Sequence, residues 1–337
     1  MLNFDDGRFL RIQSDAVALA EPIDAFVGDS LDRGLENIHF LGAGGAGVLM
    51  QPAAQQISRN SDLTVFLEKA AEIVQTGSRA LGSRSLVVIP SLSGTTHEAL
   101  DVLQLAQSKG ASVLALTGDP ESPVAQAADT NFSVGASDDT SSESFYLQSL
   151  LLALSVLRRR GELQDYSRTV EELAQMPSLL LRAKQAFEGR AEKLAMQLQD
   201  VDYHIFTGAG GPWTEAWYFA TCILEEMQWI RTRPVHASDY FHGTLELVEK
   251  GVSVVLLKGE GPSRALADRV ERFTPTVTDK LTVIDSADFD LGSLRDSTRE
   301  LVSHIVHATV LQRFAAHLEQ ERRHPLSTRR YYRRLDY

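Results

Sequence analysis

The segment from Pro90 to Glu98, Pro-Ser-Leu-Ser-Gly-Thr-Thr-His-Glu, has the residue types of a phosphate-binding turn. Four hydroxyl side chains fall within six residues: Ser91, Ser93, Thr95 and Thr96. Hydroxyl groups can donate hydrogen bonds to phosphate oxygens, and Gly94 lets the backbone approach a ligand closely. The alternative is that these residues only cap a helix, for which Ser and Thr are preferred. One cap needs one hydroxyl, so the pattern favours phosphate binding.

The flanking sequence predicts a strand before this turn and a helix after it. Residues 85–89, Ser-Leu-Val-Val-Ile, are typical of a buried strand, and apolar residues recur at helical spacing over 98–107. The first N–H groups of a helix lack partners within the helix, and the helix dipole places partial positive charge there. A helix that starts at this turn would therefore stabilise a bound anion.

A second glycine-rich turn, Gly42-Ala-Gly-Gly-Ala-Gly47, follows a predicted strand at 37–41. It fits the dinucleotide fingerprint, and Glu68 lies about twenty residues further on, where that fingerprint places a ribose-binding acid. The hydroxyl-rich turn and a later repeat of Gly-Ala-Gly-Gly are not expected of a dinucleotide site. We therefore favour a small substrate approached by Gly42 and Gly44, and keep a nicotinamide cofactor as the alternative.

The second half of the chain repeats the order of motifs in the first half. The turn at 39–45, His-Phe-Leu-Gly-Ala-Gly-Gly, has a counterpart at 205–211, Ile-Phe-Thr-Gly-Ala-Gly-Gly. At nearly the same separation along the chain, residues 87–94 align with residues 254–261. Two glycine-rich turns can match by chance, but a second match in the same order favours duplication of one α/β unit.

The two copies differ at the positions that would hold phosphate. Lys258 and Glu260 stand where the first copy has Ser91 and Ser93. A glutamate directed into an anion site repels phosphate. We therefore expect one phosphate site per chain, in the first copy.

Strands that alternate with helices in both halves predict the α/β fold class, with two tandem three-layer α/β/α units that each contain a mainly parallel, doubly wound sheet. We expect five segments: a helical lead over 1–36, a first domain with the phosphate site over 37–160, a helical linker over 161–200, a second domain over 201–320 and a C-terminal tail over 321–337.

Composition narrows the class of protein. The chain has 337 residues, enough for two domains, and a net charge of −12, which argues against nucleic acid as a partner. Its basic run, Arg329, Arg330, Arg333 and Arg334, is interpreted as a docked tail. A single cysteine, Cys222, excludes intrachain disulfides and fits a reducing cytoplasm. We see no signal peptide, membrane-spanning run or zinc-ligand spacing, so we predict a cytoplasmic protein without membrane, metal or cofactor.

The glycine turn combined with Ser-x-Ser-Gly-x-Thr resembles the sugar isomerase (SIS) family of domains, which are phosphosugar-binding α/β units that often occur in tandem. The resemblance covers residues from about 30 to the end of the chain. It implies that Ser91, Ser93 and Thr96 hold the phosphate of a sugar. A further set is expected to contact the substrate: Gly42, Gly44, Gly94, Thr95, His97 and Ser141. Leu92 departs from the polar residue common at its position.

The second half is similar to the isomerase half of glucosamine-6-phosphate synthase and, more closely, to the fructosamine-6-phosphate deglycases of the fructoselysine-6-phosphate type. The matching segments are Leu-Glu-Glu-Met-Gln-Trp at 224–229 and His-Ala-Ser-Asp-Tyr-Phe-His-Gly-Thr at 236–244. The resemblance implies that Glu226 moves a proton between sugar carbons and that His242 assists ring opening and acts as an acid. Ile223 replaces the lysine of the amidotransferases, and Thr244 replaces the usual proline.

Residue types alone do not choose between Glu225 and Glu226, which point about 100° apart on a helix. The family register selects Glu226. We expect this side chain to be partly buried against the apolar residues Ile223, Met227 and Ile230, because partial desolvation makes a carboxylate a stronger base.

Segments at 118–126, 321–331 and 335–337 also resemble the deglycases. The resemblance therefore implies an enzyme that cleaves a small sugar phosphate conjugate, a 6-phosphofructosyl amine, into glucose 6-phosphate and a free amine, and that forms a homodimer. Two alternatives stay open: an isomerase or deaminase of a ketose, aldose or amino-sugar phosphate, and a phosphosugar sensor without catalysis.

Overall fold

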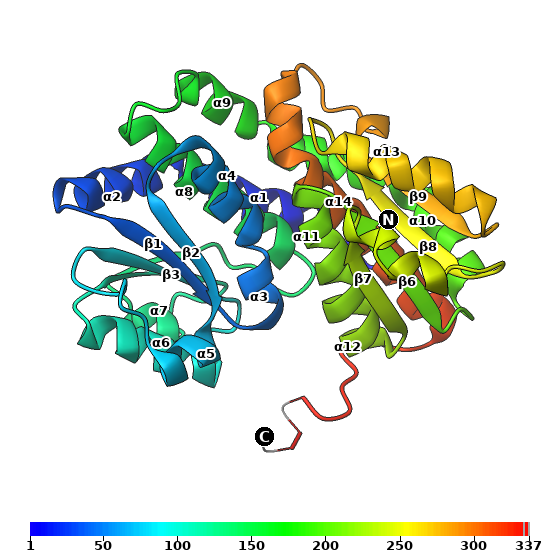
Figure 1. The fold of residues 1–337 in the computed structure, drawn as a ribbon, viewed down its shortest axis with the longest axis horizontal. Coiled ribbons are helices and arrows are strands. Elements are labelled where there is room, and N and C mark those ends of the chain that lie inside the picture. The colour runs from blue at the N-terminus through cyan, green and yellow to red at the C-terminus, as the bar shows by residue number, and fades with distance from the viewer. Residues whose placement is uncertain (333, 336–337) are drawn as a thin grey trace. The chain divides into compact units, whose positions relative to one another are not determined.

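A computed structural model describes residues 1–332, 334 and 335. It divides into two compact units (Figure 1). The N-terminal unit comprises residues 6–177, and the C-terminal unit comprises Met1–Asp5 together with the chain from Ser178 onward. The division falls inside the segment predicted to be a linker. Three residues of the predicted tail, Arg333, Asp336 and Tyr337, lie outside the described residues.

The N-terminal unit is built on a five-stranded sheet in the order β2-β1-β3-β4-β5, and all its neighbouring strands are parallel. The strands are β1 (Asn37–Gly42), β2 (Thr64–Lys69), β3 (Ser85–Ser91), β4 (Ser112–Thr117) and β5 (Thr130–Ser133). The central strand β3 is buried along its whole length, as its continuous apolar run predicts. Because parallel strands end at one edge, the turns after β1 and β3 share the carboxyl edge of this sheet.

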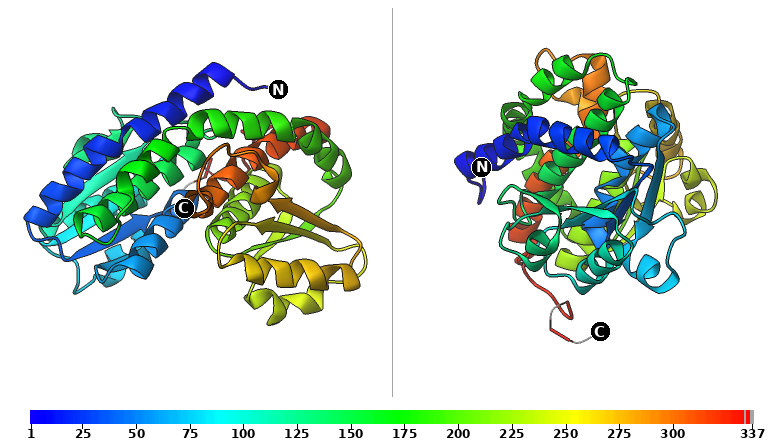
Figure 2. Two further views of the ribbon diagram at one scale, coloured as in Figure 1. Left: turned by 90° about the horizontal axis from the view of Figure 1, so that it is seen from above. Right: turned by 90° about the vertical axis from the view of Figure 1, so that its left-hand side faces the viewer.

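Helices cover both faces of this sheet, which makes the three predicted layers (Figure 2). The helices of this unit are α1 (Asp6–Ala18), α2 (Ala20–Asp32), α3 (Gly44–Val48), α4 (Gln51–Asn60), α5 (Ala70–Thr76), α6 (His97–Ser108), α7 (Pro123–Ala127), α8 (Ser141–Arg159) and α9 (Tyr166–Leu173). Helix α8 is buried over most of its length and packs against α1, α2 and α4. On the other face, Val87 and Ile89 of β3 pack against residues of α5, α6 and α7.

The C-terminal unit has a four-stranded parallel sheet in the order β7-β6-β8-β9. Its strands are β6 (Tyr203–Gly208), β7 (Arg231–His236), β8 (Ser253–Lys258) and β9 (Leu281–Asp285). Its helices are α10 (Met176–Leu198), α11 (Gly211–Tyr218), α12 (Glu226–Gln228), α13 (Arg264–Phe273) and α14 (Asp296–Arg322), with a π-helical turn over Phe219–Glu225. The strand order repeats β2-β1-β3-β4 of the first sheet, as duplication of one unit requires.

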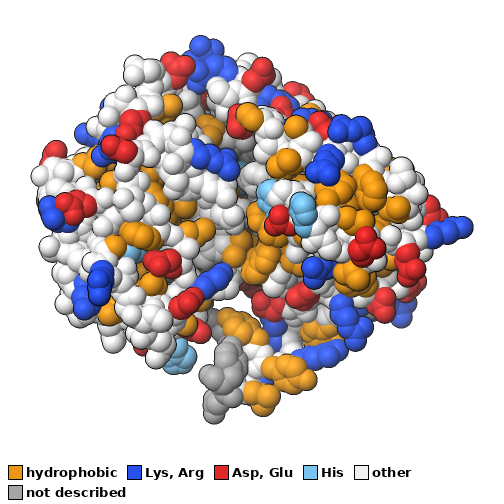
Figure 3. Space-filling model, in the orientation of Figure 1, with side chains coloured by type: hydrophobic (Ala, Val, Ile, Leu, Met, Phe, Trp, Pro, Cys, Tyr) orange, Lys and Arg blue, Asp and Glu red, His pale blue; other side chains and the backbone are white. Residues whose placement is uncertain are grey.

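Strand β7 has no counterpart among the sequence predictions. Its residues, Arg-Thr-Arg-Pro-Val-His, are mostly polar, and Pro234 cannot donate a backbone hydrogen bond. The sheet tolerates this proline because β7 is an edge strand that pairs only with β6. On the face shown in Figure 3, acidic and basic side chains are interspersed over both units.

Glu188 on α10 ties the first residues of the chain to the C-terminal unit. Its Oε1 accepts a hydrogen bond from the Leu2 N–H at 2.8 Å, and its Oε2 accepts one from Arg313 Nε at 2.6 Å. Arg313 also donates to the carbonyl oxygen of Leu2 at 2.6 Å. Burial by itself would raise the pKa of Glu188, but the hydrogen bonds from Arg313 and Leu2 outweigh it and hold the pKa at about 2.

Replacing Glu188 with glutamine should lower the free energy of unfolding by about 2–3 kcal/mol at pH 7. The folded pKa lies below the unfolded one, so the charged carboxylate stabilises the fold above pH 4.5, and this stabilisation is lost as the pH falls from 4.5 toward 2. Urea denaturation of the wild type and the variant should therefore show that the substitution lowers the free energy of unfolding by about 1 kcal/mol less at pH 3.5 than at pH 7. Glu192→Gln, an exposed change on the same helix, is the control. An equal decrease in the free energy of unfolding at both pH values would contradict the conclusion that the charge of Glu188 stabilises the fold.

Candidate active site

The hydroxyl-rich turn lies where the sequence places it, between the end of β3 and the start of α6. Ser91 is the last residue of β3 and only 4% exposed, and its Oγ lies 3.4 Å from Thr96 Oγ1. The hydroxyl of Thr95 donates to Ser93 Oγ at 3.0 Å. Thr96 is the residue before the helix, yet its side chain makes no capping hydrogen bond. Capping therefore does not account for these hydroxyl groups, which gather at the start of a 12-residue helix.

Gly94 sets the shape of this turn. Its φ of +60° lies in the left-handed region, and a Cβ at this position would lie 2.0 Å from Ser122 Oγ. Its N–H donates to the carbonyl of Ser91 at 3.1 Å, and its carbonyl accepts from the Val124 N–H at 3.0 Å. These bonds hold the turn against the start of α7, so only glycine fits here without a shift of the backbone.

The other predicted contact residues of this unit differ in accessibility. Thr95 and His97 are exposed at the start of α6, so a ligand can reach both. Ser141, the first residue of α8, is 2% exposed, and its hydroxyl lies 3.5 Å from the carbonyl of Asp138. Gly44 is exposed with a φ of +52°, whereas Gly42 is buried at the end of β1.

Close backbone packing explains part of the glycine motif without any ligand. A Cβ on Gly42 would lie 2.4 Å from the Cα of Gly47, so the end of β1 can meet α3 only if glycine occupies this position. Glu68, the candidate ribose acid, has its Oε2 at 3.4 Å from Nδ1 of the buried His39. Burial lowers the pKa of His39. The motif therefore has a structural role here, and its acid already has a protein neighbour.

The two neighbouring glutamates of the C-terminal unit have different partners. Glu225 ends the π-helical turn, and its Oε1 accepts hydrogen bonds from the N–H and hydroxyl of Thr232 at 3.1 and 2.6 Å. Glu226 Oε1 accepts from Arg329 Nε at 2.9 Å. The Glu226 side chain is 40% exposed, less buried than the sequence predicts, because Ile223, Met227 and Ile230 pack into the core and leave it on the outer side. Its carboxylate is accessible to a substrate.

His242 lies in a loop after a single 3-10 turn, Asp239–Phe241. Its backbone N–H donates to the carbonyl of Asp239 at 2.8 Å, and its side chain is exposed. The next residue, Gly243, has a φ of +111°, which only glycine adopts readily. Thr244 is buried, and its Oγ1 accepts from Arg233 Nε at 3.0 Å, so the departure from proline is used in packing. The exposed imidazole of His242 is accessible to a ligand.

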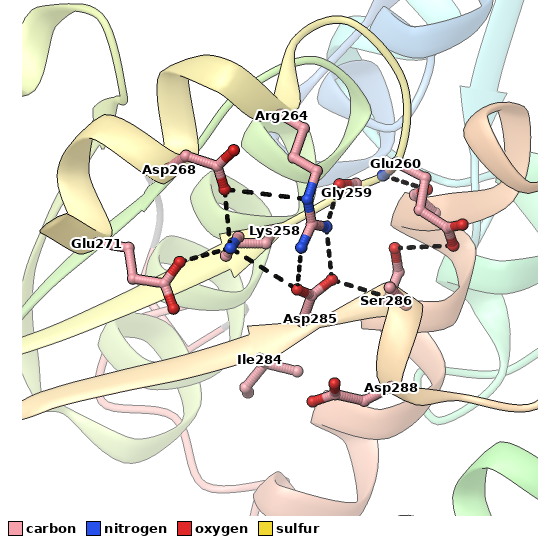
Figure 4. A network of polar contacts seen from close by, with 12 residues as sticks. Lys258, Gly259, Glu260, Arg264, Asp268, Glu271, Ile284, Asp285, Ser286 and Asp288 are labelled. Carbon is pink, nitrogen blue, oxygen red and sulfur yellow. Dashed lines mark hydrogen bonds and ion pairs between the residues drawn. The ribbon is translucent and has the colours of Figure 1, made fainter.

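The counterpart turn after β8 contains a closed ion-pair network (Figure 4). Lys258 is buried at the end of β8 and pairs with Asp268 at 2.8 Å and Glu271 at 2.5 Å. Burial would lower the pKa of Lys258, but hydrogen bonds to these two carboxylates outweigh it and raise the pKa. Arg264 holds Asp285 through two hydrogen bonds of 2.8 and 2.5 Å.

Glu260 of the same turn accepts hydrogen bonds from Arg299 at 2.7 and 3.0 Å. In the first sheet Ser91 lies opposite Thr117, and at the equivalent place in the second sheet Lys258 lies opposite Asp285. Hydroxyl groups in one copy therefore correspond to charged groups in the other. The charged side chains of the second turn are therefore paired with charged groups of the protein itself, and one phosphate site per chain stays a prediction.

Comparisons with known proteins agree with this architecture. The SIS domain family model matches residues 34–158. Fructosamine deglycase FrlB of Bacillus subtilis strain 168 is 31% identical over 94% of this chain and 97% of its own. Fructoselysine 6-phosphate deglycase of Escherichia coli K12 is 28% identical over 80% of this chain and 79% of its own. A solved structure from Bacillus subtilis, provisionally assigned as a phosphosugar isomerase, has a TM-score of 0.88 and 30% identity over 96% of this chain and 100% of that one.

Two parallel α/β units, of which the first has a hydroxyl-rich turn after its central strand, are typical of the class of tandem phosphosugar-domain proteins. This chain belongs to the sugar isomerase (SIS) domain family, in the group that contains the fructosamine deglycases. The predicted fold class is confirmed. Among the described residues, no helix is both long and apolar enough to cross a membrane.

Proposed function

We propose that this protein is a fructosamine-6-phosphate deglycase. It converts a 6-phosphofructosyl amine and water into glucose 6-phosphate and a free amine. The observation that carries the proposal is the 31% identity to a fructosamine deglycase over nearly the full length of both chains. The exposed carboxylate of Glu226 and the exposed imidazole of His242 support it. So does the hydroxyl-rich turn before α6, where the Thr96 side chain makes no capping hydrogen bond.

In the proposed reaction, the hydroxyls of Ser91, Ser93 and Thr96 and the N–H groups that begin α6 bind the phosphate. The ketose must first open to its linear form. His242 assists by transferring a proton at the ring oxygen.

Glu226 then removes a proton from C1, the carbon that carries the amine nitrogen. The electron pair of that C–H bond forms the C1–C2 double bond, and the C2 carbonyl oxygen gains a proton to give an enaminol. Reprotonation at C2 converts the enaminol into an imine at C1. Water adds to C1, the C–N bond breaks, and glucose 6-phosphate and the amine leave.

An isomerase that moves a proton between C1 and C2 of a phosphosugar would use the same residues. The likeness to the provisionally assigned phosphosugar isomerase keeps this reaction as the second candidate. Only the deglycase releases an amine, so analysis of the products separates the two reactions.

The test is incubation with 6-phosphofructosyl-lysine and 6-phosphofructosyl-asparagine, followed by detection of glucose 6-phosphate through a coupled dehydrogenase. Release from either compound would support deglycation and begin to identify the amine. Release from neither, with fructose 6-phosphate still raising the melting temperature, would favour the isomerase.

We also infer that the protein acts as a homodimer in the cytoplasm. The resemblance to the deglycases supports the dimer, and a single cysteine, whose thiol has its pKa raised to about 12 by burial and nearby carboxylates, suits a reducing compartment. Light scattering after size-exclusion chromatography should give twice the chain mass of 37.1 kDa. A mass of one chain at micromolar concentration would contradict the dimer.

A further inference from the structure

A groove of about 810 Å³ lies in the C-terminal unit beside Glu226. We call it the tail groove, and the C-terminal segment is residues 326–332. The residues that matter for its chemistry are Glu226, Trp229, Arg231, Arg329, Arg330 and Tyr331. Figure 1 shows the C-terminal segment leaving the core near α12, and Figure 3 shows basic and apolar side chains at this lower edge of the C-terminal unit.

Specific contacts hold the C-terminal segment at this groove. Arg329 donates from Nε to Glu226, and from Nη1 to the carbonyl of Leu326 at 2.6 Å. The Arg330 guanidinium lies 4.0 Å from the centre of the Trp229 ring. Trp229 in turn contacts His324, with ring centres 4.4 Å apart. The segment is therefore anchored beside the carboxylate that we assign as the base.

The groove has positive charge available for a ligand. Within residues 1–332, 334 and 335, neither Arg231 nor Arg330 forms an ion pair with a carboxylate, whereas Arg329 is paired with Glu226. Among the carboxylates that line the groove with Asp202, Glu225 accepts hydrogen bonds from Thr232, and Glu226 accepts one from Arg329. The Arg330 guanidinium carbon lies over the Trp229 ring, and a guanidinium that stacks on an aromatic ring can still donate from the N–H groups in its plane. Such a planar fork matches the geometry of a carboxylate.

The chemistry of the proposed reaction directs the amine toward this groove. Glu226 takes the proton from C1, and the amine nitrogen is bonded directly to C1. The substituent on that nitrogen must therefore begin within two bonds of the carbon that Glu226 meets. The groove beside Glu226 is large enough for such a substituent, and Trp229 and Tyr331 offer apolar faces to its carbon chain.

We propose that the tail groove binds the amine half of the substrate and that Arg330, aided by Arg231, recognises a carboxylate on that amine. The inference rests on the proposed deglycase function and deepens it. Arg330 is a specificity-determining residue, and the preferred substrates are conjugates of amino acids, with simple alkylamines disfavoured.

The test compares two matched pairs of substrates that differ only in the carboxylate. One pair is 6-phosphofructosyl-lysine, linked through its side-chain amine, and 6-phosphofructosyl-cadaverine; the other is 6-phosphofructosyl-alanine and 6-phosphofructosyl-ethylamine. Release of glucose 6-phosphate gives kcat/KM for the wild type, for Arg330→Gln and for Arg323→Gln. Arg323 is an exposed arginine outside the groove and serves as the matched control.

The wild type should prefer the carboxylate-bearing member of at least one pair by tenfold or more. Arg330→Gln should lower kcat/KM for that member about 10- to 30-fold, mainly through KM, because a hydrogen bond between charged groups is lost. The same variant should change kcat/KM for the decarboxylated member by less than about twofold. Arg330→Lys should give an intermediate result, since it keeps the charge but not the fork.

Equal losses on both members of a pair would show that Arg330 acts only through its packing on Trp229, and would overturn the inference. A wild type that is active on both members without preference would also overturn it while leaving the deglycase function in place. Release from none of the four compounds would contradict the deglycase function itself, and the inference with it.

Discussion

Replacing Glu226 with glutamine should lower kcat for deglycation by about a thousand-fold or more and leave phosphosugar binding nearly unchanged. Glutamine has the same shape but cannot accept the proton from C1. Its side-chain oxygen can still accept the hydrogen bond from Arg329, so the C-terminal segment should stay in place. Glucose 6-phosphate release measures the first effect, and calorimetry with fructose 6-phosphate measures the second.

Glu225→Gln is the comparison that separates the two adjacent carboxylates. Its side-chain oxygen would keep both hydrogen bonds from Thr232, and we expect kcat within about fivefold of the wild type. Normal turnover in the Glu226 variant would end the assignment of this residue as the base. A thousand-fold loss in the Glu225 variant alone would move the role to its neighbour.

Replacing Gly94 with alanine should weaken fructose 6-phosphate binding by about a hundred-fold, equivalent to about 2.7 kcal/mol. The new Cβ would lie 2.0 Å from Ser122 Oγ, and alanine is strained at a φ of +60°. The turn must therefore move, and the N–H and hydroxyl groups that would bind phosphate move with it. Isothermal titration gives the loss of affinity, and thermal unfolding should show a melting temperature lower by about 5 °C.

Two further variants identify the cause of this effect. Gly135→Ala places alanine at a φ of +65° with no atom within 4 Å of the new Cβ, so it carries the backbone strain without the overlap. It should lower stability by about 1 kcal/mol and leave the affinity intact. Adding Ser122→Gly to the Gly94 variant removes the overlapping atoms and should recover part of the binding. Unchanged affinity in the single Gly94 variant would show that phosphate does not bind at this turn.

The sequence specified the strands that are buried. Residues 37–41 and 85–89 are predicted as strands and lie within β1 and β3, and the helical spacing over 98–107 lies within α6. Continuous apolar runs identify strands that are covered on both faces, and helical spacing identifies amphipathic helices. The same patterns failed at β7, because an edge strand has one exposed side and tolerates Pro234.

The sequence analysis places Glu225 and Glu226 on one helix, but in the structure a π-helical turn ends at Glu225 and α12 begins at Glu226. Apolar spacing cannot reveal this change, because a shift of the backbone hydrogen bond by one residue leaves the residue types as they are. Such turns are frequent at functional sites.

By itself the sequence determined which residues have chemistry to offer: the hydroxyls around Gly94, the paired glutamates and the exposed histidine. Side-chain type and the local order of strand, turn and helix single out the hydroxyls, whereas the resemblance to the deglycases singles out the glutamates and the histidine. The tertiary structure alone decided their partners. Glu226 meets Arg329 across 103 positions, and Arg330 lies on Trp229. Contacts between residues so far apart depend on how the chain packs, because no local spacing relates them.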